Sequence, residues 1–171
     1  MSKIFKDANT MGVIISRMQV PYLTSGHINL IRTIQDRHNK LLVLLGVSNE
    51  INNKNPFSFD FRKQMIQKFM RPCDNIMPVR DNKDNAAWVK QVDYLVGASL
   101  YSDENAILYG SRDSFIPYYE KDKGSFRTQE LLPEDNDSGT ELRSIATTKL
   151  PLYTLEVAEA IIYTVNILTK K

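Results

Sequence analysis

The sequence is short of cysteine and of long apolar runs. Its 171 residues include a single cysteine, Cys73, which excludes an intramolecular disulfide and a thiol-rich metal site. No apolar run approaches the length needed to cross a membrane, and the first ten residues, MSKIFKDANT, are too polar for a signal peptide. These absences favour a reducing environment, and we expect a cytoplasmic protein without a membrane partner.

A strong excess of one charge is also missing. The chain carries 22 Lys and Arg against 20 Asp and Glu, a net charge of +2, and both signs are spread along its length. This balance argues against a nucleic-acid partner, whereas small anionic substrates still fit. The length suits a single domain over 1–171, with residues 1–10 as a flexible start and a final helix at about 150–171.

Apolar segments of strand length alternate with segments of helical periodicity. Strands are predicted at 11–15, 41–47, 75–80, 106–109 and 125–131, with Pro78 indicating an edge strand or a strand end. Helices are predicted after Gly26, at about 58–71, from Trp88 to Val96, from Ser138 onward and at about 154–168, and a short helix or turn at 114–120 would be broken by Pro117. This alternation predicts an α/β fold, with an open, mostly parallel five-stranded sheet and helices on both faces.

The first predicted strand leads into a polar turn, Thr24-Ser25-Gly26-His27, that opens a helix. The first N–H groups of a helix lack internal partners and carry partial positive charge, so an anion is favoured there. Gly26 permits close approach of a phosphate, and His27 adds a side-chain donor. On the alternative interpretation these residues only cap the helix, and His27 is an ordinary surface side chain.

A second segment of this kind is SGTELR, residues 138–143. Ser138 and Glu141 fit a capping box, which by itself explains both residues. It does not explain the rest: Gly139 and Thr140 open the backbone to a ligand, and Arg143 can reach the same anion about one turn later. Together the two helix starts predict a polyphosphate held between His27 and Arg143.

The segments TSGH (24–27) and SGTELR (138–143) resemble two motifs of the nucleotidylyltransferase superfamily. More narrowly, the chain from Gly12 to Arg143 resembles the nicotinamide-nucleotide adenylyltransferases of the archaeal, bacterial bifunctional and phage type. The resemblance implies a Rossmann-like, doubly wound fold. It also implies transfer of a nucleotidyl group from a nucleoside triphosphate, with release of pyrophosphate.

Further segments extend the resemblance and imply the site residues. Residues 16–19 stand where the family has GRFQ, residues 55–57 with Arg62 stand where it has NPF and a helix arginine, and residues 110–113 with Tyr118 and Tyr119 resemble its G-x-x-(K/R)-D segment. The implied catalytic residues are Thr24, His27 and Arg143. The implied ATP-binding residues are Ser16, Arg17, Met18, Gln19, Gly26, Gly110, Ser138, Gly139 and Thr140.

Asp81, Asn85 and Trp88 match the residues with which this family binds nicotinamide mononucleotide. Asn85 and Trp88 are three residues apart on one helix face, so an indole can stack on a cationic ring while the asparagine bonds its amide. Asp81 could accept a hydrogen bond from the carboxamide or the ribose. On composition alone, a single tryptophan at a helix start is more often an anchor of the core.

The implied reaction joins ATP to nicotinamide mononucleotide and yields NAD and pyrophosphate. Mg²⁺ would accompany ATP, held chiefly by phosphates and water, because no carboxylate cluster has metal-binding spacing. We also expect a homo-oligomer. Two alternatives stay open: another phosphorylated acceptor, such as nicotinate mononucleotide, phosphopantetheine or a phospho-sugar, and a catalytically idle nucleotide-binding module. Ser16, which replaces a family glycine, is the one hint of the latter, and Thr24 replaces a family histidine.

Five remaining polar residues receive no role in the site. His38 is predicted to lie at a solvated helix end, and Arg32 and Arg37 on the exposed face of the first helix. For Tyr118, as for its neighbour Tyr119, core packing and contact with a ribose are equally open.

Overall fold

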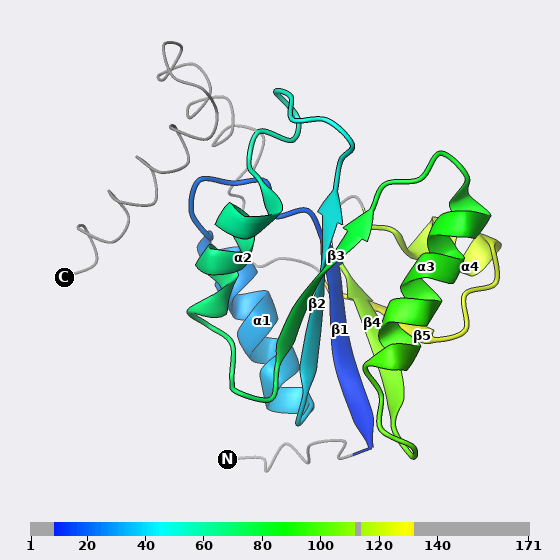
Figure 1. Ribbon diagram of the computed structural model, residues 1–171. Coiled ribbons are helices and arrows are strands. Elements are labelled where there is room, and N and C mark those ends of the chain that lie inside the picture. Colours follow the sequence, from blue (N-terminus) through cyan, green and yellow to red (C-terminus); the bar gives the residue numbers. More distant parts are fainter. Residues whose placement is uncertain (1–8, 112–113, 132–171) are drawn as a thin grey trace.

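The computed structural model describes residues 9–111 and 114–131, in which strands and helices alternate as the sequence predicts. In chain order the elements are β1 (Thr10–Ser16), α1 (Ser25–Arg37), β2 (Leu41–Val47), α2 (Phe59–Gln67), β3 (Asn75–Arg80), α3 (Asn85–Ala98), β4 (Asn105–Gly110), α4 (Ile116–Lys121) and β5 (Arg127–Glu130). The sheet separates two pairs of helices, α1 with α2 and α3 with α4 (Figure 1). The predicted α/β, Rossmann-like fold is confirmed.

The strands form one parallel sheet in the order β3-β2-β1-β4-β5. The chain moves outward from β1 to β3 and then returns to β4 on the other side of β1. Ligands of such sheets bind beyond the carboxyl ends of the strands, where the order reverses. β3 is an edge strand, as Pro78 indicated, because an edge strand can lack a ladder donor.

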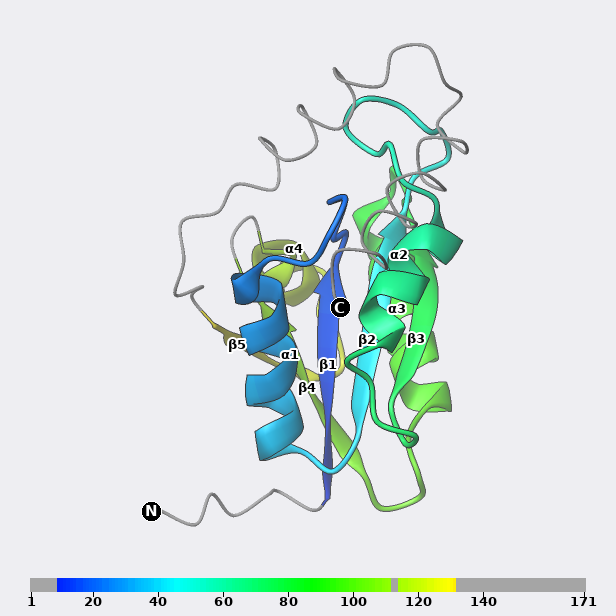
Figure 2. The same cartoon turned by 90° about the vertical axis from the view of Figure 1, so that its left-hand side faces the viewer.

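β2 shows why a continuous apolar run was the right signal for a central strand. Leu42 and Leu44 belong to the hydrophobic cluster under α3, whereas Leu41, Val43 and Leu45 belong to the cluster under α1 and α2. All five side chains are fully buried, since helices cover both faces of the sheet. Figure 2 shows the α1 and α2 side of this arrangement.

Three helices begin with side-chain caps. Thr24, Ser58 and Asp84 precede α1, α2 and α3, and their side chains accept hydrogen bonds from N–H groups of the first turn. Such caps satisfy donors that the helix itself leaves unpaired. Since each of these helices follows a strand, the three N-termini lie toward the carboxyl edge of the sheet.

Some element boundaries differ from the predictions. α2 ends at Gln67, four residues before the predicted end at Arg71. Pro72 disfavours a helical conformation at Arg71 itself. Pro117 does not break α4 but lies in its first turn, where its missing N–H is not needed. β5 is shorter than predicted, and the helices predicted after Ser138 and at 154–168 lie outside the described residues.

The prediction for His38 is wrong. Its ring is 2% exposed rather than solvated, with Nε2 2.8 Å from the Tyr109 hydroxyl and Nδ1 2.9 Å from Thr10 Oγ1. A Cβ at Gly12 would lie 2.8 Å from this ring and 2.3 Å from Ile34. The missing side chain of Gly12 therefore makes room for a histidine that joins the end of α1 to β1 and β4.

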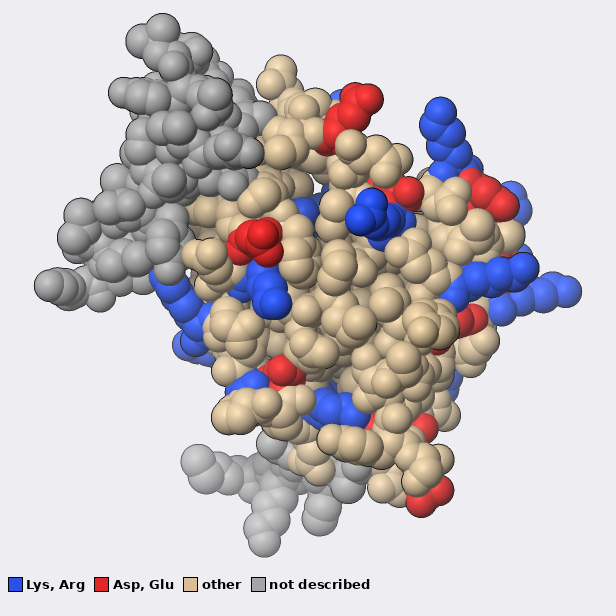
Figure 3. Space-filling model, viewed as in Figure 1, with Lys and Arg blue, Asp and Glu red and all other residues tan. Residues whose placement is uncertain are grey.

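Charged side chains of both signs are interspersed on the face seen in Figure 3, with no patch of a single sign over the described residues there. This distribution agrees with the near balance of charges in the sequence. The helices in the described part of the chain are all too short or too polar to cross a membrane.

Candidate active site

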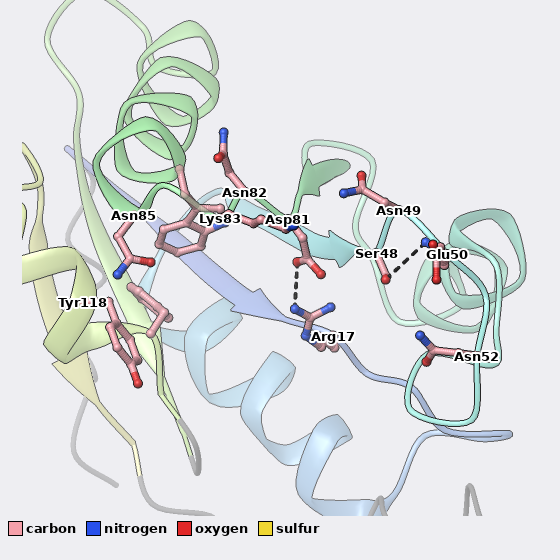
Figure 4. Close-up of a pocket in the computed structure, with 12 residues that line it drawn as sticks. Arg17, Ser48, Asn49, Glu50, Asn52, Asp81, Asn82, Lys83, Asn85 and Tyr118 are labelled. Carbon is pink, nitrogen blue, oxygen red and sulfur yellow. Dashed lines mark hydrogen bonds and ion pairs between the residues drawn. The ribbon is translucent and has the colours of Figure 1, made fainter.

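A pocket of about 550 Å³ opens among loops that follow the strands, at the edge where the fold predicts a ligand (Figure 4). Its lining contains two cations, Arg17 and Lys83, and two anions, Glu50 and Asp81, so its formal charges cancel. The lining residues are Arg17 after β1; Ser48, Asn49, Glu50 and Asn52 after β2; Asp81, Asn82, Lys83, Asn85 and Trp88 after β3; and Phe115 and Tyr118 at α4.

Arg17 links the two loops that form the walls of this pocket. Its Nη2 lies 2.7 Å from Asp81 Oδ1, and its Nη1 donates to Asn55 Oδ1 at 3.1 Å. The Arg17 and Asp81 side chains are 48% and 33% exposed, so their ion pair adds little to folding stability. The contact matters for geometry, because it joins an expected ATP residue to an expected mononucleotide residue.

A buried arginine supports the backbone beneath this ion pair. Arg62 of α2 is 1% exposed, and its Nη1 donates to the carbonyl oxygens of Arg17 at 2.6 Å and Gly46 at 2.9 Å. Its Nε donates to the carbonyl oxygen of Ser58 at 3.1 Å. A buried guanidinium needs such partners. The sequence analysis matched Arg62 to a helix arginine of the family but did not predict its burial or its backbone partners.

Gln19 and Met18, both expected to bind ATP, have buried side chains. Gln19 is 2% exposed, and its amide donates to the Phe57 carbonyl at 3.1 Å and accepts from the Phe57 N–H at 2.9 Å. Met18 is 3% exposed, with a φ of 44° that turns the chain sharply after Arg17. Gln19 therefore joins the loop after β1 to the segment before α2, whereas Met18 packs in the hydrophobic cluster under α1 and α2.

The Thr24 cap also orients the imidazole of His27. The Thr24 N–H donates to His27 Nδ1 at 3.2 Å, and Thr24 Oγ1 lies 2.9 Å from the same nitrogen. The His27 N–H in turn donates to Thr24 Oγ1 at 3.4 Å, which completes a capping box in which histidine replaces the usual Glu or Gln. A ring nitrogen that accepts an N–H bond carries no proton, so we infer that the neutral ring carries its proton on Nε2.

Trp88 fits both interpretations that the sequence left open, an anchor of the core and a ligand-stacking residue. It packs against the cluster under α3, with its ring centroid 6.2 Å from that of Phe115 at an interplanar angle of 53°, and it also lines the pocket. Asn85 begins α3 directly after the Asp84 cap and lines the same pocket. The structure thus brings Asp81, Asn85 and Trp88 together.

The two tyrosines of α4 have different environments. Tyr119 is fully buried, and its hydroxyl donates to Asp93 and accepts from the Phe126 N–H at 3.1 Å. Burial, and then the Asp93 carboxylate, raise the pKa of Tyr119, so the phenol stays protonated. Tyr118 is 57% exposed and lines the pocket. Tyr119 is therefore a packing residue, whereas sequence reasoning made no assignment for the pocket residue Tyr118.

The remaining site residues are placed as follows. Ser16 ends β1, Gly26 lies in the first turn of α1, and Gly110 ends β4, where a Cβ would lie 2.1 Å from Ser114 Oγ. Among the described residues, the pocket lining does not include Thr24 or His27. The predicted residues Ser138, Gly139, Thr140 and Arg143 lie outside the described residues, and so does the predicted meeting of Arg143 with His27.

Over 9–111 and 114–131, no group of three or more His, Cys, Asp and Glu residues is placed to hold a metal ion. Metal-binding sites of hard cations usually combine several such oxygen ligands.

Comparison with known proteins identifies the family. Residues 22–145, more than half of the chain, match the family model of cytidylyltransferase-like proteins. The chain belongs to this family. Membership identifies the chain as a nucleotidyltransferase domain and agrees with the superfamily that the motifs predicted. No curated protein sequence matches the chain significantly.

Solved structures share the fold of this cytidylyltransferase-like chain. A bifunctional NMN adenylyltransferase/ADP ribose pyrophosphatase from Francisella tularensis is 23% identical, with a TM-score of 0.73 over 83% of this chain and 43% of that chain. The same protein in complex with AMP and a Mn ion has a TM-score of 0.69. A NadR protein in complex with NAD and AMP-PNP is 11% identical, with a TM-score of 0.61 over 80% of this chain and 42% of that one. The chain thus spans less than half the length of these proteins.

Proposed function

We propose that the chain transfers AMP from ATP to nicotinamide mononucleotide, giving NAD and pyrophosphate. The observation that carries this proposal is the pocket in which Asp81, Asn85 and Trp88 lie together and Arg17 bonds to Asp81. An aromatic face, an amide and a carboxylate can recognise a cationic ring, its carboxamide and a ribose. Cancelling formal charges in the lining also suit a ligand that carries both a pyridinium and a phosphate.

The solved neighbours support this choice of substrates. One is named as an NMN adenylyltransferase and has been seen with AMP and a Mn ion, and another binds NAD and AMP-PNP. Divalent metal use by a neighbour fits Mg²⁺ as the partner of ATP in this chain. Since the described residues contain no acidic cluster of metal-site size, we assign the ion to the phosphates and water and give no side chain a metal-binding role.

The proposed chemistry needs no nucleophilic side chain. A phosphate oxygen of the mononucleotide attacks the α-phosphorus of ATP, the bond from that phosphorus to the oxygen bridging to the β-phosphorus breaks, and pyrophosphate leaves. The protein aligns two anions and stabilises the charge that develops on their oxygens. We propose that His27 supplies a donor from Nε2 to the α-phosphate, and that Thr24 holds its ring in position. Ser138, Gly139, Thr140 and Arg143 would bind the β- and γ-phosphates.

A substrate panel with product identification tests the proposal. The full chain is incubated with Mg²⁺, ATP and, in turn, nicotinamide mononucleotide, nicotinate mononucleotide and phosphopantetheine, and pyrophosphate and the adenylylated product are measured. We expect the fastest turnover with nicotinamide mononucleotide. Faster turnover with another acceptor would show that this acceptor, and not nicotinamide mononucleotide, is the substrate. Nucleotide binding without pyrophosphate release would favour the catalytically idle module.

The Trp88→Ala variant connects the reaction to this pocket. We expect its KM for nicotinamide mononucleotide to rise roughly tenfold, with the KM for ATP unchanged, because loss of a stacking face removes about 1 to 2 kcal/mol. A KM for the mononucleotide equal to that of the wild-type chain would show that Trp88 does not bind the mononucleotide.

A further inference from the structure

The Arg17 side chain is held on two sides by loops that follow different strands. Its Nη1 donates to Asn55 Oδ1 at 3.1 Å in the loop after β2, and its Nη2 donates to Asp81 Oδ1 at 2.7 Å after β3 (Figure 4). Its stem lies over Gly46 of β2, where a Cβ would lie 3.2 Å from Arg17 Cγ. The guanidinium therefore spans the end of β2, and an acceptor on each side sets its direction.

Asn55 belongs to a turn that fixes its own position. Its N–H donates to the Asn52 carbonyl oxygen at 3.0 Å, and the Asn52 N–H donates back to the Asn55 carbonyl oxygen at 3.3 Å. Asn52 Oδ1 also accepts from the N–H groups of Lys54 and Asn55, both at 3.0 Å. Asn55 Nδ2 lies 3.5 Å from the same oxygen, so the two ends of the Asn55 amide have different partners. The turn thus directs Asn55 Oδ1 at Arg17.

The contact with Asn55 orients Arg17 from outside the pocket. Of the residues that the structure describes, Arg17 and Asn52 line the pocket and Asn55 does not. An amide oxygen accepts a hydrogen bond without neutralising the guanidinium, unlike the Asp81 carboxylate. A guanidinium has five N–H groups, and Asn55 and Asp81 accept from two of them. The others can donate to a phosphate, for which the planar fork of arginine is well suited.

From this geometry we propose that Asn55 is a positioning residue of the nucleotidyl transfer, which holds Arg17 so that its remaining N–H groups meet the phosphates of ATP. The inference rests on the proposed function and adds to it the residue that orients a cation of the pocket. A free arginine side chain loses rotamer freedom when it binds an anion, and an acceptor that fixes it beforehand reduces this loss. The turn at 52–55 then promotes ATP binding through Arg17.

A double-mutant cycle tests this indirect role. The affinity of the full chain for Mg·ATP is measured by titration calorimetry, which needs neither an acceptor nor turnover. Asn55→Ala should raise the dissociation constant roughly three- to tenfold, because Arg17 is no longer held. Asn55→Asp keeps an acceptor oxygen and should stay within about twofold of wild type. In the Arg17→Ala background, Asn55→Ala should have no further effect, since no guanidinium is left to position.

A matched control addresses folding of the turn. Asn53→Ala removes an exposed asparagine of the same turn that is not a lining residue, and it should leave the dissociation constant unchanged. An equal loss of affinity in Asn53→Ala would show a general effect of the turn and would overturn the positioning role. Failure of Asn55→Asp to retain affinity, or an additive loss in the Arg17→Ala background, would overturn it as well.

The same measurements separate this inference from the proposed function. Wild-type affinity in Asn55→Ala, with NAD formation by the wild-type chain, would overturn the role of Asn55 and leave the proposed function intact. ATP binding that depends on Asn55, in a chain that forms no NAD, would overturn the proposed acceptor and leave the positioning role intact. Absence of ATP binding by the wild-type chain would overturn both.

Discussion

At the scale of single residues, the main feature is the coupling of His27 to Thr24. The Thr24 backbone and hydroxyl both contact His27 Nδ1, which directs the proton to Nε2 and fixes the ring at the N-terminus of α1. The replacement of a family histidine by Thr24 thus retains a function that a hydroxyl can perform: it caps the helix and orients its neighbour. It gives up the positive charge that a histidine could carry.

The first prediction concerns His27→Ala. We expect kcat for pyrophosphate release to fall by about a hundredfold or more, which is typical for loss of a donor to the transition state. The matched variant Thr24→Ser keeps the hydroxyl and should stay within about threefold of wild type, because the cap and the ring position survive. Unchanged kcat in His27→Ala would exclude the imidazole from the reaction.

At the scale of elements, the loops after β1, β2 and β3 are held together by two arginines of different character. Arg17 lies at the surface and joins Asn55 to Asp81 through side chains, whereas Arg62 is buried and joins the backbone of three segments. Exposed ion pairs stabilise a fold weakly, while unsatisfied buried groups destabilise it strongly. The two arginines should therefore respond differently to substitution.

For the surface pair we predict an effect on binding and little effect on stability. Asp81→Asn should change the free energy of unfolding by less than about 1 kcal/mol, as for other exposed pairs, yet raise the KM for nicotinamide mononucleotide roughly tenfold. Glu104→Gln breaks the Lys40–Glu104 pair, 2.6 Å long and at the amino end of β4, and should leave this KM unchanged. Equal KM changes in both variants would show that the effect is not specific to the pocket.

For the buried arginine we predict the opposite balance. Arg62→Met keeps a long apolar side chain but leaves the carbonyl oxygens of Arg17 and Gly46 without this donor, so the free energy of unfolding should fall by about 2 to 4 kcal/mol. Arg32→Met on the exposed side of α1 should change it by less than about 0.5 kcal/mol. Urea unfolding measures both, and equal midpoints for Arg62→Met and wild type would contradict the role of Arg62.

At the scale of the whole molecule, Asp74, which precedes β3, connects α1, β2 and the segment after α2. Its carboxylate accepts from the Leu41 N–H at the start of β2, from Gln35 of α1, and from Arg71, whose Nη2 lies 2.9 Å away. Burial by itself would raise the pKa of Asp74, but the hydrogen bonds from Arg71, Gln35 and Leu41 outweigh it and lower the pKa. The charged form therefore stabilises the fold.

The sign of this shift gives a prediction for the pH dependence of stability. A lowered folded-state pKa adds stability that is fully present above the unfolded value of 3.8 and is lost as the pH falls through the folded value. At pH 7, Asp74→Asn should lower the free energy of unfolding by about 2 to 3 kcal/mol, and this difference should shrink below about pH 4. The exposed Asp103→Asn control should show little difference from wild type at either pH. A difference that is constant with pH would exclude ionisation of Asp74 as its cause.

Local patterns in the sequence determined much of this protein. The apolar run of β2 and the Thr24 cap of α1 were readable, because strand burial and helix capping depend on residues a few positions apart. The grouping of Asp81, Asn85 and Trp88 came instead from the family resemblance, and all three line one pocket. Only the tertiary structure decided which distant residues meet. Arg17 and Asp81 are 64 positions apart.

Long-range contacts also explain what the sequence analysis did not predict correctly. His38 was predicted to be solvated, and Arg62 was matched to a family arginine without any prediction of its burial. The order of the strands and the covering of both sheet faces bury both residues beside backbone and side-chain partners. Tyr118 and Tyr119 are neighbours in sequence, and only the packing of α4 on α3 separates a pocket residue from a core residue. Burial and long-range contact are properties of the assembled layers, and no local pattern encodes them.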